Sequence, residues 1–106
     1  MNEMAVRLLE ILKRHEGKDF DATLQDPAEG KAGFSFMSYI ETGSIRVGPG
    51  RVAVSERGTG KFFCLPLDGI AEIQDEGGGE DDAAYSVTYD NRYSVFIQIF
   101  DRTALL

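Results

Sequence analysis

The sequence predicts an α+β domain, because the spacing of its apolar residues changes once along the chain. Apolar residues first recur at intervals of three and four, which places them on one face of a helix. From residue 19 onward they alternate with polar residues, as in strands that have one buried and one exposed face. Two short turns in the middle of the chain impose one common strand register. We therefore expect an N-terminal amphipathic helix packed on a strongly twisted antiparallel β-meander of about seven strands.

Length and composition indicate a single domain covering residues 1–106. The 106 residues, 42% of them hydrophobic, suffice for one modest core. No run approaches the roughly 20 apolar residues of a membrane-spanning helix, and Glu3, Arg7 and Glu10 interrupt the N-terminal segment where a secretory signal would be apolar. We expect a cytoplasmic protein with no membrane partner. Its single cysteine, Cys64, excludes an intramolecular disulfide.

The helix is predicted over residues 2–16. Asn2 is suited to cap its N-terminus, and Gly17 is suited to end it in a left-handed backbone conformation. A helix of this length is marginal by itself in water, so its apolar face must pack on the strands. That face consists of Met4, Ala5, Leu8, Ile11 and Leu12, widened by Val6 and Leu9.

The meander is predicted over residues 19–100 and begins with two strands. In the first, residues 19–25, the acids Asp19 and Asp21 alternate with apolar residues and are expected on the exposed face. In the second, the alternation changes phase at Met37 and Ser38, which predicts a β-bulge at that point. The apolar residues of this second strand are Phe34, Phe36, Met37, Tyr39 and Ile40.

Two hairpin turns determine the register of the next three strands. A turn at residues 48–51 places Val47 opposite Val52 and Ile45 opposite Val54. A second turn at residues 57–60 extends the same face, because it places Phe63 opposite Val54 and Leu65 opposite Val52. The two turns agree independently, so we predict that this apolar face is buried.

The last third of the meander contains an acidic segment and a hairpin. Residues 70–73 fit a short strand or a helical turn equally well. Residues 75–82 hold three glycines and five carboxylates, and are predicted to be a mobile loop without the ligand spacing of a calcium site. In the final hairpin, a three-residue loop at 90–92 aligns Val87 and Val95 on one face, whereas a two-residue loop separates them, so we predict three residues.

The order of a helix followed by a strongly bent meander resembles Sm-like and related SH3-type small barrels. The segment from Leu65 to Ile73, with its central turn, is similar to the tight turn before their last strand. This resemblance implies a closed small barrel, and the hairpin from Tyr85 to Phe100 is additional to its five-stranded core. It concerns layout alone, because the paired Asp and Asn with which Sm-type proteins hold a base have no counterpart at a matching position. No functional residue is carried over.

The charge of the chain is distributed unevenly. The net charge is −7, but residues 44–65 hold four basic residues and one acid, a net +3, so the remainder carries −10. Basic and aromatic side chains on the outward face of these strands are suited to bind nucleic acid or another anion. The candidate binding face consists of Arg46, Arg51, Arg57, Lys61 and Phe62. The acidic remainder disfavours nucleic acid as the partner.

No catalytic constellation is visible. Any triad must use the single histidine, His15, whose position near the helix C-terminus already favours a structural role. Cys64 has no basic neighbour in the sequence that would activate its thiol. One histidine and one cysteine about fifty residues apart do not make a zinc site. We therefore expect no enzyme, no metal and no cofactor.

The terminal strand is apolar on both faces, which predicts that it is central, lies under the helix or meets a second subunit. Its candidate contact residues are Val95, Phe96, Ile97, Ile99 and Phe100. Together with the split charge and the absence of a catalytic constellation, this strand favours a non-enzymatic binding or adaptor module that acts through protein contacts. A homo-oligomer is expected, and nucleic-acid or anion binding through the basic face is the alternative.

Overall fold

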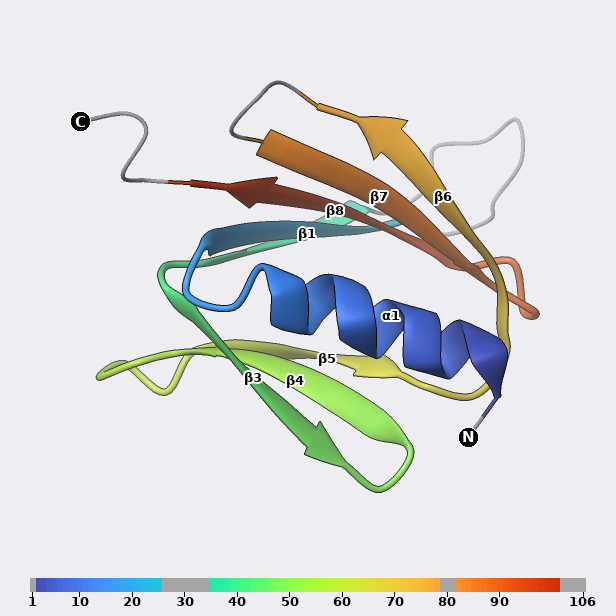
Figure 1. Cartoon of the computed structure of the whole chain (residues 1–106), viewed down its shortest axis with the longest axis horizontal. Coiled ribbons are helices and arrows are strands. Elements are labelled where there is room, and N and C mark those ends of the chain that lie inside the picture. The colour runs from blue at the N-terminus through green and yellow to red at the C-terminus, as the bar shows by residue number, and fades with distance from the viewer. Residues whose placement is uncertain (1, 26–34, 79–81, 102–106) are drawn as a thin grey trace.

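The computed structural model describes residues 2–25, 35–78 and 82–101, which form one helix and eight strands (Figure 1). The elements are α1 (Glu3–Arg14), β1 (Asp19–Gln25), β2 (Ser35–Ile40), β3 (Gly43–Gly48), β4 (Arg51–Glu56), β5 (Phe62–Pro66), β6 (Ile70–Gly77), β7 (Asp82–Tyr89) and β8 (Ser94–Phe100). The α+β class is confirmed. The strand beyond the expected seven is β6, for which the sequence pattern allowed either a strand or a helical turn.

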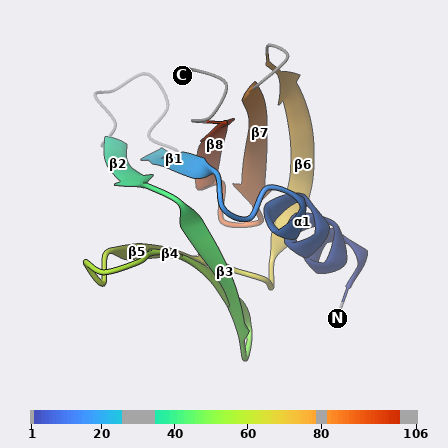
Figure 2. The same ribbon diagram turned by 60° about the vertical axis from the view of Figure 1, so that its left-hand side comes forward.

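The strands divide into two antiparallel sheets. One has five strands in the order β2-β1-β8-β7-β6, and the other has three in the order β3-β4-β5. The chain crosses between the sheets at two corners, from β2 into β3 and from β5 into β6 (Figure 2). The closed barrel implied by the layout is not formed, because no hydrogen-bonded ladder joins the two sheets among the described strands.

The helix α1 lies between the two sheets on the side of β6 and β3 (Figure 2). The side-chain oxygen of Asn2 accepts a hydrogen bond from the amide of Ala5 at 2.8 Å, which confirms the expected N-cap. The helix ends at Arg14, and Gly17 follows in the left-handed region with φ +91°. Ala5, Leu8, Ile11 and Leu12 are its buried residues, as the apolar spacing predicts.

The core lies between the sheets and is shared by the helix and both sheets. Val52 and Val54 of the three-stranded sheet and Phe20 and Ile40 of the five-stranded sheet are completely buried. The predicted common face of β3, β4 and β5 is confirmed, but its burial is uneven. Val52, Val54 and Leu65 are buried, Ile45 and Phe63 are partly buried against the core, and Val47 at the end of the face is 45% exposed. Burial of this face is what fixes the register, since a shift of one residue would turn all these side chains outward.

All three predicted hairpin registers are confirmed. Ile45 pairs with Val54, and Val54 pairs in turn with Phe63, as the two turns require. In the last hairpin the amide of Tyr89 donates to the carbonyl of Tyr93 at 2.9 Å, which leaves three loop residues. The third of these, Arg92, has φ +74°, the left-handed conformation that closes a three-residue hairpin loop.

Carboxylates hold the corner between β2 and β3, where the backbone leaves one ladder and has not yet joined the next. Asp19 accepts hydrogen bonds from the amide of Thr42 at 2.9 Å and the hydroxyl of Tyr39 at 2.8 Å. Glu16 accepts one from the amide of Ile45 at 2.8 Å. The expectation that Asp19 lies on an exposed face is wrong, because its carboxylate is needed inside the corner and it is only 3% exposed.

The expected β-bulge at Met37 and Ser38 is also wrong. β1 and β2 pair without interruption from Phe20 opposite Ile40 to Gln25 opposite Ser35. The change of phase arises because β2 places apolar residues on its outer face, where Met37 is 72% exposed. Phe34, which was expected in this strand, lies outside the described residues.

The acidic segment is shorter as a loop than predicted. β6 extends through Asp75 to Gly77, and β7 begins at Asp82. The backbone amide of Gly77 donates to the carboxylate of Asp75 at 2.8 Å, so part of this polar segment is ordered as an edge strand. The register of β6 against β7 shifts twice, as in many edge strands. Residues 79–81 lie outside the described part of the chain.

Candidate functional site

An apolar groove follows β5 where the two sheets diverge. It consists of two adjoining hollows of about 470 Å³ and about 200 Å³, which share Leu24, Cys64, Leu65 and Val95. The remaining lining comes from Ala22 of β1, the middle of β2, Phe63 of β5, the corner between β5 and β6, and the β7–β8 hairpin. No lining residue comes from α1, so the groove and the helix occupy different openings between the sheets.

The floor of the groove results from strand pairing. Leu24 near the end of β1 pairs with Val95 near the start of β8, so the two side chains lie on the same face of the five-stranded sheet. Leu65 of β5 faces them from the other sheet. Val95 is 5% exposed and Leu65 is 3% exposed, whereas Leu24 is 37% exposed. Leu24 is therefore the floor residue that presents the most apolar surface to a ligand.

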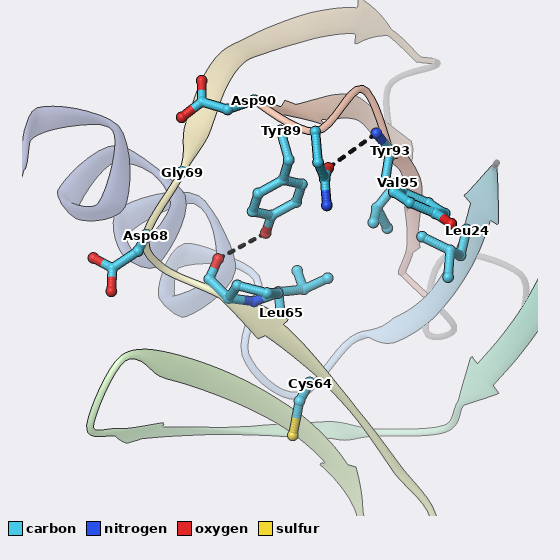
Figure 3. Close-up of a pocket in the computed structure, with 11 residues that line it drawn as sticks. Leu24, Cys64, Leu65, Asp68, Gly69, Tyr89, Asp90, Tyr93 and Val95 are labelled. Carbon is cyan, nitrogen blue, oxygen red and sulfur yellow. Dashed lines mark hydrogen bonds between the residues drawn. The ribbon is translucent and has the colours of Figure 1, made fainter. Parts of the chain in front are cut away.

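Tyr89 connects the hairpin to β5 at one end of the groove (Figure 3). Its hydroxyl donates to the carbonyl oxygen of Pro66 at 2.7 Å. Burial raises the pKa of Tyr89 to about 12, so the phenol stays protonated and remains a donor at neutral pH. This hydrogen bond holds the wall of the groove in place.

The polar side chains of the groove do not converge. Figure 3 shows the sulfur of Cys64 directed away from Tyr89 and Leu65, and the carboxylates of Asp68 and Asp90 directed outward at the rim. The thiol of Cys64 is exposed. The lining therefore has the residue types of a catalytic site without its geometry, because no acid, base or nucleophile points at a common position.

His15 lies elsewhere, at the end of α1. The Nζ atom of Lys18 is 3.1 Å from its Nδ1, and its ring centroid is 6.5 Å from that of Tyr85. Partial burial, followed by the charges of Lys18 and Arg14, lowers the pKa of His15. The lowered pKa opposes a positive charge on this histidine at the helix end, and its ring instead contacts Lys18 and Tyr85.

Only three of the five residues of the predicted basic face line a common hollow. A hollow of about 530 Å³ on the outer face of the three-stranded sheet is lined by Arg46, Arg57 and Phe62, but Arg51 and Lys61 do not line it. All five side chains are exposed. Arg46, Arg57 and Phe62 are thus brought together at the hollow, whereas Arg51 and Lys61 lie apart from it.

The terminal strand β8 is central, between β1 and β7. Val95, Ile97 and Ile99 lie in the core, so they are not available to a second subunit. Phe96 and Phe100 are half-buried on the outer face of the sheet. Self-association through this strand stays a prediction, limited to these two residues. Light scattering across a wide concentration range checks it, and a monomer throughout contradicts it.

Sequence reasoning missed the groove, although one signal for it is present. Pro66 cannot donate to a β-ladder, and proline within sheets is confined to edges, strand ends and bulges. This residue therefore favours either an edge strand or a strand that ends at this position. The opposite wall, formed by Leu24 and the hairpin, depends on how the two sheets are oriented, which no local pattern encodes.

In the described ranges, no three His, Cys, Asp or Glu side chains are grouped as metal ligands would be. The described helix is too short and too polar to cross a membrane. Comparison of the chain with protein-family models, with curated proteins and with solved structures found no match.

Proposed function

We propose that this protein is a non-enzymatic binding module that takes up an extended segment of a partner protein as an added strand along β5. One observation carries the proposal: the outer edge of β5 is not paired with any described strand, and an apolar groove runs beside it. Strand addition of this kind gains affinity from main-chain hydrogen bonds and specificity from pockets that accept alternate side chains.

The backbone of β5 has hydrogen-bonding groups for such a strand. The amide of Glu56 donates to the carbonyl of Lys61 at 2.8 Å, and antiparallel pairs alternate in hydrogen bonding, so Phe63 and Leu65 bond to β4. The N–H and C=O groups of Cys64 consequently face away from β4. Pro66 ends this edge, because it has no N–H and its carbonyl already accepts from Tyr89.

The groove beside this edge concentrates exposed apolar side chains. Seven large hydrophobic residues of the described chain are exposed. Leu24 and Tyr93 line the groove, and Met37, on the outer face of β2, borders its smaller hollow. Side chains on one face of an added strand point in the same direction at every second residue. A partner segment with apolar residues at alternate positions would bury them here.

Charge defines the other feature of the partner. Asp68 and Asp90 stand at the rim near Pro66, and the chain outside residues 44–65 carries −10. A basic residue in the partner, next to its apolar positions, would complement this rim. The proposal also places the protein in the cytoplasm, where an exposed thiol such as that of Cys64 stays reduced.

Selection from a displayed library of random short peptides tests the proposal. We expect selected peptides to share alternating apolar residues with lysine or arginine next to them. Replacing Leu24 or Tyr93 with serine should weaken their binding about tenfold, as for central contact residues. Val47→Ser and Val6→Ser are matched controls, because these exposed valines lie outside the groove, and they should leave affinity unchanged.

A backbone-modified peptide distinguishes strand addition from simple apolar contact. Methylating alternate amide nitrogens of a selected peptide, on the edge that would pair with β5, removes the donors of the ladder and should abolish binding. In the unmodified complex, hydrogen exchange at the amide of Cys64 should slow. The proposal fails if the methylated peptide binds equally well, or if the Leu24 and Tyr93 variants bind like the controls.

A further inference from the structure

We infer that the hollow on the outer face of the three-stranded sheet is a second binding site, for a small aromatic anion of the nucleoside monophosphate class. It lies on the opposite face of this sheet from the core and is separate from the peptide groove. The inference therefore does not depend on the proposed function. Its basis is the combination of a shaped floor, two guanidinium groups that pair with no described residue, and one exposed aromatic ring.

The register of the sheet shapes the floor. Ser44 of β3, Ser55 of β4 and Phe62 of β5 form one row across the outer face, and Arg46 and Ala53 begin the next row. In these two rows the middle strand contributes only the small residues Ala53 and Ser55, while the large residues Arg46 and Phe62 come from the flanking strands. Glu56, the last residue of the middle strand, also lines the hollow. Since neighbouring strands are about 4.8 Å apart, Arg46 and Phe62 stand on flanks about 10 Å from each other.

The positive charges of the hollow are available to a ligand. Among the described residues, neither Arg46 nor Arg57 forms an ion pair or a hydrogen bond through its side chain. The acid in the lining, Glu56, is engaged by donors of this chain. Its two carboxylate oxygens accept hydrogen bonds from the amide of Glu41 at 2.8 Å and from the hydroxyl of Thr59 at 2.7 Å.

The other lining groups favour an anion with a planar ring. Phe62 is 61% exposed, which leaves its ring face open for stacking. The hydroxyl of Ser55 donates to the carbonyl of Ser44 at 3.5 Å and lies in the floor, between the cationic and aromatic flanks. Guanidinium groups bind phosphate by paired hydrogen bonds. In the proposed complex, the phosphate binds Arg46 and Arg57, and the base stacks on Phe62.

The charge of the whole protein limits the size of the ligand. The remainder of the chain carries −10, so a long polyanion would meet repulsion beyond the hollow. A volume of about 530 Å³ lies within the range of small-molecule sites. A mononucleotide therefore fits these observations better than an extended single strand does.

Titration of the full-length protein with AMP, monitored by amide chemical shifts in NMR, tests the inference. We expect shifts confined to residues around the hollow at millimolar AMP, and loss of these shifts at high salt. Arg46→Gln, Arg57→Gln and Phe62→Ala should each weaken binding about tenfold. Arg51→Gln and Lys61→Gln remove the same charge outside the hollow and should change affinity less than about twofold.

Three further probes separate the parts of the site. Adenosine and inorganic phosphate should each bind much more weakly than AMP, because each engages one wall only. Equal binding of adenosine or of phosphate overturns the assignment of a ligand that has both parts. A short oligothymidylate that binds more tightly than AMP, and loses affinity equally in the Arg51 and Lys61 variants, overturns it in favour of a nucleic-acid face. Absence of AMP shifts in the wild-type protein overturns it outright.

Discussion

The two sheets diverge on two sides of the molecule, and the chain treats the two openings differently. On the side of β6 and β3, α1 inserts an apolar face whose residues Leu8 and Leu12 are at most 1% exposed (Figure 1). On the side of β5, the described chain leaves a groove in which Leu24 is 37% exposed. Leu8 and Leu12 are thus part of a closed core on the helix side, whereas Leu24 is part of an open surface on the groove side.

The difference between the helix side and the groove side predicts which residues stabilise the fold and which bind a partner. On the helix side, the core is supported by the hydrogen bonds that Asp19 and Glu16 accept at the corner between β2 and β3. On the groove side, the N–H and C=O groups of Cys64 pair with no described strand. No described residue covers the apolar floor of the groove. Substitutions on the helix side should therefore cost folding free energy, and substitutions on the groove side should cost mainly binding.

The largest expected effect comes from a matched pair of leucines. Leu12→Ala should lower the free energy of unfolding by about 2–5 kcal/mol, because it leaves a cavity in a fully packed core. Leu24→Ala should cost less, about 1 kcal/mol, because more than a third of this residue is already in water. Urea denaturation followed by circular dichroism measures both. Equal losses would mean that the groove is part of the core.

The sequence sufficed for the parts of the fold in which local rules reinforce each other. The registers of β3, β4 and β5 followed from two turns that had to agree on one buried face, and both pairings were correct. The loop at residues 90–92 was correct for a similar reason, because only three residues place Val87 opposite Val95. Few strand registers satisfy both the turn geometry and the burial of one common face.

The sequence was not sufficient where a residue serves a distant element. Asp19 follows the pattern of an exposed strand residue, yet its carboxylate caps Thr42, more than twenty positions away. Met37 belongs to an outer face and so disturbs the alternation without a bulge. The candidate sites were only partly predictable for the same reason. Arg46, Arg57 and Phe62 line one hollow, but nothing local distinguishes them from Arg51 or Lys61.

The next effect in size concerns two acids on one face of β1. Asp19→Ala should destabilise the protein by about 2–3 kcal/mol, because it leaves the amide of Thr42 and the hydroxyl of Tyr39 without their buried acceptor. Asp21 is the control, since its buried Oδ1 has no hydrogen-bond partner among the described residues. Asp21→Ala should therefore be neutral or slightly stabilising. Chemical denaturation at pH 7 compares the two variants, and the reverse ranking would contradict the assigned role of the corner.

A glycine pair tests the packing at the same corner. A Cβ on Gly43 would lie 2.6 Å from Cδ1 of Phe20 and 2.9 Å from Cγ1 of Val54, so Gly43→Ala should cost about 1–3 kcal/mol through overpacking. Gly48, at the far end of the same strand, has no neighbour closer than 3.9 Å to such an atom. Gly48→Ala should change stability by less than about 0.5 kcal/mol. Thermal unfolding distinguishes them, and two equal melting temperatures would show that the corner can relax.

The smallest expected effect is a pH dependence at the end of α1. The pKa of His15 in the folded protein is lowered from 6.5, first by burial and then by Lys18 and Arg14. The unfolded chain therefore binds the proton more readily, and stability should be complete above about pH 6.5 and decline as the pH falls toward the folded pKa. His15→Gln should remove this component while leaving the acid unfolding of the carboxylates. Denaturation midpoints from about pH 7.5 to about pH 5.5 measure it. Parallel curves for the wild type and the variant would show that protonated His15 is accommodated on the helix side.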